Sequence, residues 1–380
     1  MSGPLVGPAS EYVSASRSEM TDRGSLIRSG GRFGADTILS LLTAGAAFIV
    51  MLMLAALVAV LAHASLPAIH EFGWSFLVSS EWRPNALEVP KTDANGNVII
   101  EDGETVTQTI PPSFGALPVI YGTAISSGLA IIFAVPLSFG AALFLVRIAP
   151  KVMKGPVSFL IEFLAAIPSI AYGMWGLFIL APFLQRHLES WLGHVYAAAG
   201  RPRVLHWLFQ ETSLLPTGEK LVRDLPLSGR DMFSGGLVLA VMIIPIITAI
   251  ARDVLKSVPR AQIEGTIALG ATWWQTSKEM LRYSRAGLFG AVMLGLARAA
   301  GETMAVTMVI GNNNQIRASL FAPAQTMSSL LANEFAEAST DIHRASLSEV
   351  ALILLVMSLL FNIVARYLVV GKGSRTAAAH

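Results

Sequence analysis

Long apolar runs separated by short charged segments dominate this chain. Six of the runs approach or exceed the ~20 residues that a helix needs to cross about 30 Å of hydrocarbon. Prolines inside several runs do not argue against them, because neighbouring helices can satisfy the carbonyls that a proline leaves free. We expect membrane-spanning helices at about residues 36–61, 119–146, 157–184, 235–251, 286–310 and 348–370.

The pattern therefore predicts an all-α integral membrane protein with one transmembrane domain, residues 36–370. Residues 1–35 are polar and rich in Gly and Ser, and we expect a largely disordered cytoplasmic tail there. Residues 371–380 form a second cytoplasmic tail. Three polar segments interrupt the apolar pattern, at residues 62–116, 185–233 and 257–285.

The composition agrees with a membrane location: 53% of the 380 residues are hydrophobic and 14% are charged, against about 25% charged in soluble domains. The chain has no Cys, which excludes disulfides and thiolate chemistry, and its seven His residues contain no H-x-x-x-H pair. No G-x-S-x-G motif is present either. We therefore expect no catalytic residues, no metal site and no cofactor, and we expect lipid rather than nucleic acid around the chain.

Lys and Arg in short flanking loops indicate which side of the membrane is cytoplasmic. They gather between the second and third runs, between the fourth and fifth runs, and after the sixth run. Both termini are then cytoplasmic, and the insertions 62–116 and 185–233 lie outside. In the first insertion, Asn95-Gly96 and Asp102-Gly103 are turn signals that predict a small β-hairpin. The second insertion carries six basic residues and fits the charge rule poorly; a cytoplasmic location would require a different topology.

The segment 257–285 carries helix-boundary signals. Ser257 is expected to cap a helix that starts at Pro259, and Gly270 is expected to follow its end. Thr272-x-x-Gln275 matches the capping box of a second short helix. The resulting bend is either an interfacial helix pair resting on lipid or a docking element for a cytoplasmic partner.

The fifth run contains two charged residues, Arg298 and Glu302. Their spacing of four places them on one helix face, about 6 Å apart along the axis. An Arg near the bilayer centre costs at least ~2.5 kcal/mol, so it should face protein or water. The pair is either a structural ion pair or a charge site on an anion path. In the second case, Glu302 would accept the proton that hydrogen phosphate carries. Sulfate has no such proton.

Two other features of the apolar runs have simpler interpretations. Ala291, Gly295 and Ala299 form a ladder of small residues on an adjacent helix face, which indicates close packing against another helix. Glu162 is a carboxylate near the cytoplasmic end of the third run. It either reaches the interface or contributes to a path.

Several stretches carry a resemblance to a known family. Glu264 and Gly270, in a loop before the penultimate run, resemble the EAA loop of ABC importer permeases. Glu264-Gly265-Thr266 stands where Glu-Ala-Ala is usual, and Arg282-Tyr283 stands where Leu-Pro is usual. Four longer stretches are similar to PstC-type permeases of phosphate ABC transporters: Phe114–Leu145, Ile161–Pro182, Gly295–Asn313 with its GETMAV motif, and Ser319–Ala338.

The resemblance implies the type I ABC importer permease fold, with six transmembrane helices. It implies that the segment 257–285 docks on an ATPase subunit through Glu264, Ala268, Gly270 and Trp273. It also implies that Arg298, Glu302 and Thr303, on the family's R-x-x-G-E-T pattern, lie on the phosphate path.

The same resemblance implies the partners. These are a homologous PstA-like permease, two PstB-like ATPase subunits and a periplasmic or lipid-anchored PstS-like phosphate-binding protein, in the cytoplasmic (inner) membrane. This chain has no G-x-x-x-x-G-K-[ST] motif, so ATP hydrolysis is expected in a separate subunit and the chain is not expected to be an enzyme.

Three alternatives remain open from the residues. The nearest is a permease for another oxyanion, sulfate or molybdate, which GETMAV fits less well. A membrane-embedded enzyme would need a nucleophile or a metal set that the sequence lacks. A role in phosphate signalling through the same partners is compatible with the sequence.

Overall fold

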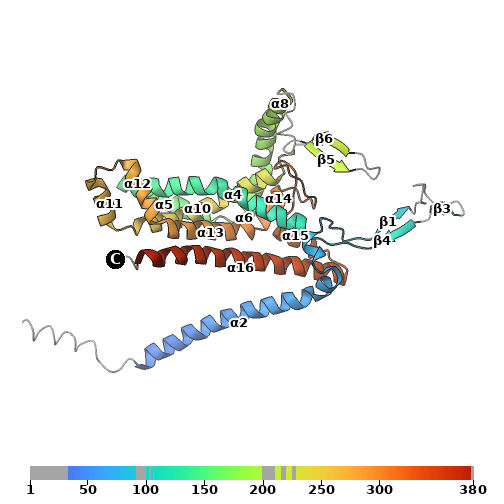
Figure 1. The fold of residues 1–380 in the computed structure, drawn as a ribbon, viewed down its shortest axis with the longest axis horizontal. Coiled ribbons are helices and arrows are strands. Elements are labelled where there is room, and N and C mark those ends of the chain that lie inside the picture. The colour runs from blue at the N-terminus through green and yellow to red at the C-terminus, as the bar shows by residue number, and fades with distance from the viewer. Residues whose placement is uncertain are drawn as a thin grey trace, which may run out of the picture. The chain divides into compact units, whose positions relative to one another are not determined.

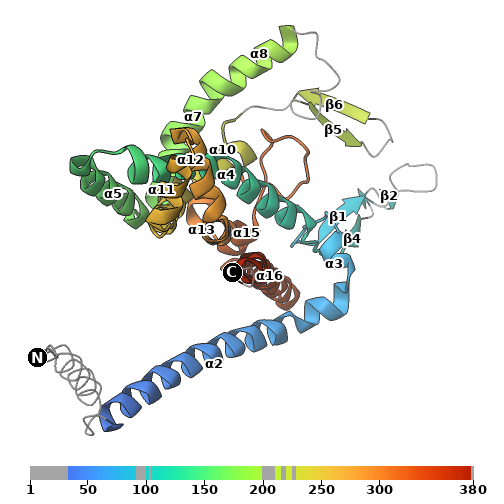
Figure 2. The ribbon, with the colours of Figure 1, turned by 60° about the vertical axis from the view of Figure 1, so that its left-hand side comes forward.

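The computed structural model describes residues 33–90, 100–101, 104–105, 107–198, 210–214, 220–224 and 228–377 (Figures 1 and 2). The chain divides into two compact units, Met1–Val60 and Leu61–His380. Helix α2 (Phe33–Phe72) begins in the first unit, where its side chains are almost all exposed. Of the predicted tail 1–35, residues 1–32 lie outside the described residues.

Helices form most of the second unit, and several contain π-helical turns. After α2 the order is α3 (Ser75–Val78), α4 (Leu117–Leu143), η1 (Phe144–Ile148), α5 (Lys151–Ala166), α6 (Ser169–Trp175), η2 (Gly176–Leu180), α7 (Ala181–Phe183), η3 (Leu184–Glu189), α8 (Ser190–Ala198), α10 (Met232–Lys256), α11 (Arg260–Ala268), α12 (Trp273–Tyr283), α13 (Arg285–Ala300), α14 (Met304–Val309), α15 (Met327–Glu334) and α16 (Asp341–Ala377).

The two insertions contribute short antiparallel strand pairs. In the first, β1 (Leu87–Pro90) pairs with β4 (Thr107–Ile110), and β2 (Ile100–Glu101) pairs with β3 (Glu104–Thr105). The turn residues Asn95-Gly96 and Asp102-Gly103 lie outside the described residues. In the second insertion, β5 (Gln210–Leu214) pairs with β6 (Lys220–Asp224). We did not expect this second pair from the sequence.

Helix α10 is the centre of the main core. It packs against both α4 and α13, which also contact each other. Ile243 and Ile247 of α10 are fully buried there. Gly295 of α13 faces Ile247 so closely that an added Cβ would lie 2.6 Å from its side chain. Ala291 and Ala299 on the same face are also buried, which confirms the predicted packing role of this ladder.

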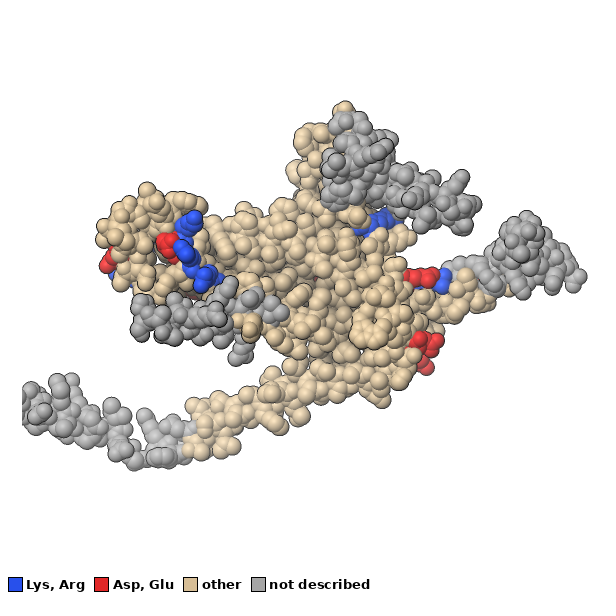
Figure 3. Space-filling model, viewed as in Figure 1, with Lys and Arg blue, Asp and Glu red and all other residues tan. Residues whose placement is uncertain are grey.

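Four described helices are long and apolar enough to cross a membrane: Thr37–Phe72, Leu117–Ile148, Met232–Lys256 and Asp341–Ile363. A fifth span exists if α5 and the helical segment Ser169–Tyr196 count together. Charged side chains gather near the ends of the helices on the face that Figure 3 shows. The predicted number of six spans stays a prediction.

The predicted third span, 157–184, is not a single straight helix. The chain bends by 90° between α5 and α6. Ile167 has extended backbone angles, φ −64° and ψ 131°, as expected for a residue that precedes a proline. The Tyr172 hydroxyl donates to the carbonyl of Leu164 across the bend, 2.7 Å away.

The predicted fifth span, 286–310, is also interrupted. Helix α13 ends at Ala300 and α14 starts at Met304, with Gly301, Glu302 and Thr303 between them. Gly301 has a low helix propensity, and the Glu302 carboxylate accepts a hydrogen bond from the backbone N–H of Ala305. This bond caps α14 from outside, which a residue inside an unbroken helix would not do. The expectation of one continuous helix is therefore wrong.

Candidate functional site

Arg298 and Glu302 form an ion pair across the break between α13 and α14. Arg298 Nη1 lies 3.0 Å from Glu302 Oε2. The exposed fractions of the two side chains differ greatly, at 47% for Arg298 and 3% for Glu302. The carboxylate is therefore held inside the chain, and the guanidinium reaches its surface.

Both carboxylate oxygens of Glu302 have partners. Oε2 faces Arg298, and Oε1 accepts from the N–H of Ala305 at 3.3 Å. A buried carboxylate is tolerated when it is paired and hydrogen-bonded in this way. The break in the helix supplies the second partner, because it frees the N–H of Ala305 from the helical ladder.

Thr303 lies beside the pair and is half-buried. Its hydroxyl donates to the carbonyl of Gly301 at 3.4 Å, and its own carbonyl accepts from the Thr307 hydroxyl at 2.7 Å. The three predicted path residues Arg298, Glu302 and Thr303 are thus in one place. Thr303 is bonded to the backbone of the break and not to the ion pair.

A residue that we did not predict contacts the same break. The Ser328 hydroxyl, on α15, donates to the main-chain carbonyl of Glu302 at 2.6 Å. Ser328 is 26 residues away in the chain; it lies in the stretch Ser319–Ala338 named above, but we assigned it no role from the sequence. Only the tertiary structure brings it to Glu302.

The predicted docking segment forms two helices joined by a left-handed glycine. Gly270 has a φ of +80° and directly follows the C-cap of α11. Its N–H donates to the carbonyl of Ile267, and the N–H of Ala271 donates to the carbonyl of Thr266. These two bonds define a Schellman motif, so the prediction that Gly270 ends α11 is confirmed.

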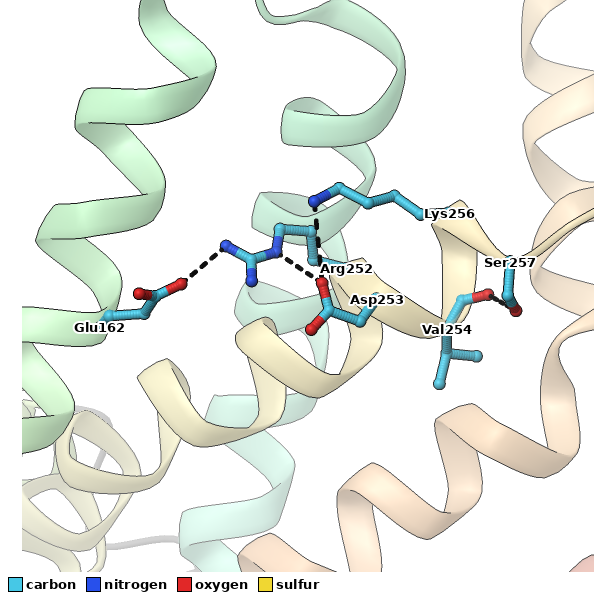
Figure 4. A network of polar contacts seen from close by, with 6 residues as sticks. All are labelled: Glu162, Arg252, Asp253, Val254, Lys256 and Ser257. Atoms are coloured by element: carbon cyan, nitrogen blue, oxygen red, sulfur yellow. Dashed lines mark hydrogen bonds and ion pairs between the residues drawn. The ribbon is translucent and has the colours of Figure 1, made fainter. Parts of the chain in front are cut away.

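The second helix of this segment starts as expected, but the first does not. Thr272 and Gln275 form the predicted capping box at the start of α12. Ser257 does not cap α11, whose N-cap is Pro259. The Ser257 hydroxyl instead donates to the carbonyl of Val254 in the last turn of α10 (Figure 4).

The bend between α11 and α12 presents apolar side chains to its surroundings. Leu269 is 90% exposed, and Ile267, Trp273 and Trp274 are each about half-exposed or more. Glu264 and Ala268, the other predicted contact residues, are also exposed. Helices α11 and α12 lie at one end of the bundle that α4, α10 and α13 form, and α15 lies at the other (Figure 1).

Glu162 belongs to a polar network instead of reaching the interface alone. Its carboxylate lies 3.2 Å from Nη1 of Arg252, and Nε of Arg252 donates to Asp253 at 3.0 Å (Figure 4). Lys256 approaches the same Asp253 oxygen at 3.7 Å. The network joins α5, which has no buried residue of its own, to the end of α10.

Comparison with known proteins places this architecture in a class. The family model of the binding-protein-dependent transport system inner membrane component matches residues 134–371. That range contains the end of α4, all of α10 and α13, the bend 257–285 and the Arg298–Glu302 pair. The chain is therefore an integral membrane component of this class of transport systems.

Relatives narrow the class. The chain is 39% identical to the phosphate transport system permease protein PstC of Mesorhizobium japonicum, over 90% of this chain and 92% of the relative. It is 38% identical to PstC of Haemophilus influenzae, over 86% of this chain and 90% of the relative. The chain belongs to the PstC family of phosphate transport system permease proteins.

Among solved structures, the inward-facing MetNI methionine ABC transporter is similar at 17% sequence identity. The TM-score is 0.43, and the match covers 68% of this chain and 94% of that chain.

Proposed function

We propose that this chain is the translocation subunit of an ATP-driven importer that carries inorganic phosphate across the cytoplasmic membrane. The observation that carries the proposal is the Arg298–Glu302 pair, whose carboxylate is buried and whose guanidinium reaches the surface. The names of the PstC relatives support phosphate as the solute.

Arg298 is suited to a tetrahedral oxyanion. Its contact with Glu302 is made through Nη1, so Nη2 and Nε retain donors in a fixed planar fork. Glu302 neutralises the guanidinium while the path is empty. An arriving phosphate then exchanges water for charged donors. Glu302 Oε2, which faces Arg298, can accept a second hydrogen bond and is the proposed acceptor for the proton that hydrogen phosphate carries.

The exposure of the Arg298 side chain favours the presence of a second membrane subunit beside it. An arginine inside an apolar helix must face protein or water, because contact with lipid is costly. We propose that a PstA-like permease covers this face and that the path runs between the two subunits.

The bend between α11 and α12 is the proposed contact for the ATPase. Its exposed apolar side chains, with Glu264 beside them, form a protruding surface that a partner protein can cover. One of two PstB-like ATPase subunits would dock there, and a PstS-like binding protein would deliver phosphate at the other end. Both chain termini would then be cytoplasmic.

Phosphate uptake by an Arg298→Ala variant tests the proposal. The complete importer should assemble in normal amounts but lose uptake, because the path lacks its cationic donor. Normal uptake by this variant would exclude the pair from the path. Competition by sulfate and molybdate in the wild-type assay distinguishes phosphate from the other oxyanions.

A further inference from the structure

The backbone of the helix break is held by a residue outside α13 and α14. The main-chain oxygen of Glu302 accepts from the Ser328 hydroxyl at 2.6 Å, and Ser328 is 3% exposed. This bond is short for a hydroxyl donor, and it is shielded from water.

The direction of this hydrogen bond is defined by its neighbours. A serine hydroxyl has one proton to donate, and the carbonyl of Glu302 can only accept. The contact of 3.2 Å between Ser328 Oγ and Thr326 Oγ1 must therefore use the proton of Thr326. Thr326 Oγ1 in turn accepts from the N–H of Ser329, so each group in this chain of bonds has a consistent role.

The start of α15 is itself fastened to α4. The N–H of Met327 donates to the Thr123 hydroxyl at 2.9 Å. The carbonyl of Gln325 lies against Gly122, where an added Cβ would be 2.1 Å from the carbonyl oxygen. Such an approach is possible only for glycine. The residues directly before Ser328 are thus fixed to α4, so Ser328 links the break to an element other than α13 and α14.

We propose that Ser328 is a positioning residue for the anion path: by holding the Glu302 carbonyl, it keeps the Glu302 carboxylate between Ala305 and Arg298. This inference rests on the proposed function of the ion pair. When the Ser328 bond is lost, the three-residue break gains freedom to rotate. The Glu302 carboxylate then loses its contacts with Ala305 and Arg298 for part of the time. Phosphate therefore meets an Arg298 side chain that is less firmly positioned.

The test is Ser328→Ala in the complete importer, with Ser138→Ala as the matched control. Ser138 is likewise buried, and its hydroxyl likewise donates to a main-chain carbonyl of another element, that of Ile244 in α10, at 3.2 Å. Uptake is measured against phosphate concentration, together with the amount of the chain in the membrane. Arg298→Ala is run alongside.

We expect Ser328→Ala to raise the KM for phosphate by about three- to tenfold, as for the loss of one buried hydrogen bond, with Vmax and membrane amount nearly unchanged. Ser138→Ala should leave the KM unchanged. A KM that stays at the wild-type value in Ser328→Ala, or that rises equally in Ser138→Ala, overturns this inference. Retained uptake in Arg298→Ala overturns the proposed function instead.

Discussion

Arg298 and Glu302 lie 3.0 Å apart on either side of a point where their helix ends, and only Arg298 is accessible. In an unbroken helix the two residues would be neighbours on one face and would have similar surroundings. The break turns the carboxylate inward, where it caps α14. The pair therefore presents one charge, and that charge is positive.

Glu302→Gln should weaken the preference for phosphate over sulfate. The amide keeps the size of the side chain but removes the acceptor charge for the proton of hydrogen phosphate. Because hydrogen bonds to charged groups contribute roughly 1.5–3 kcal/mol, we expect the ratio of the two uptake rates to fall at least about tenfold. Competition between labelled phosphate and sulfate measures it. An unchanged ratio in a variant that still transports would rule out the proton-acceptor role.

Glu264→Lys should uncouple ATP hydrolysis from uptake. Glu264 is exposed on α11, so the substitution changes the charge of the surface and not the packing of the core. Charge reversal at a docking face costs a few kcal/mol of partner affinity. Uptake and ATP hydrolysis are measured in the same vesicles, and the membrane amount of the chain is the control. If uptake per ATP is unaltered, α11 is not the coupling element.

Gly270→Ala should loosen the bend between α11 and α12. Its φ of +80° costs a residue with a Cβ about 1–2 kcal/mol, although space around it is open. Gly265→Ala is the matched control, since Gly265 is in the interior of α11, also with open space, and alanine there adds roughly 0.5–1 kcal/mol of helix stability. Tryptic cleavage after Arg260 and after Lys278 in inside-out vesicles should be faster in the first variant and slower in the second. Equal cleavage would contradict the strain argument.

Arg252→Ala should weaken the attachment of α5 to α10. The Arg252 side chain is 11% exposed and bridges Glu162 and Asp253, so its loss leaves two carboxylates without their shared cation. We expect a destabilisation of about 1–2 kcal/mol, because the guanidinium is buried but both acids are more than half-exposed. Lys256→Ala, which removes only an exposed pair at 3.7 Å, should change stability by less than about 0.5 kcal/mol. The midpoint of thermal unfolding of the purified chain is measured for both variants and for the wild type.

Local rules predicted part of the structure correctly. Gly270 and the Thr272–Gln275 capping box depend on a few neighbouring residues, and both form as expected. Ser257 shows where such rules fail. As an N-cap its hydroxyl would accept from a backbone N–H of α11; instead it donates to a carbonyl in the last turn of α10, which extends to Lys256.

By itself, the sequence determined the class of this protein, its apolar helices, the bend between α11 and α12 and the presence of a charged pair. These follow from hydropathy and from short-range backbone preferences, which act within a few residues. The tertiary structure decided the bend before Pro168, the break at Gly301–Thr303 and the exposure of Arg298. It also decided that Ser328 holds the break, because that contact joins segments far apart in the chain and arises only when α15 packs on α4.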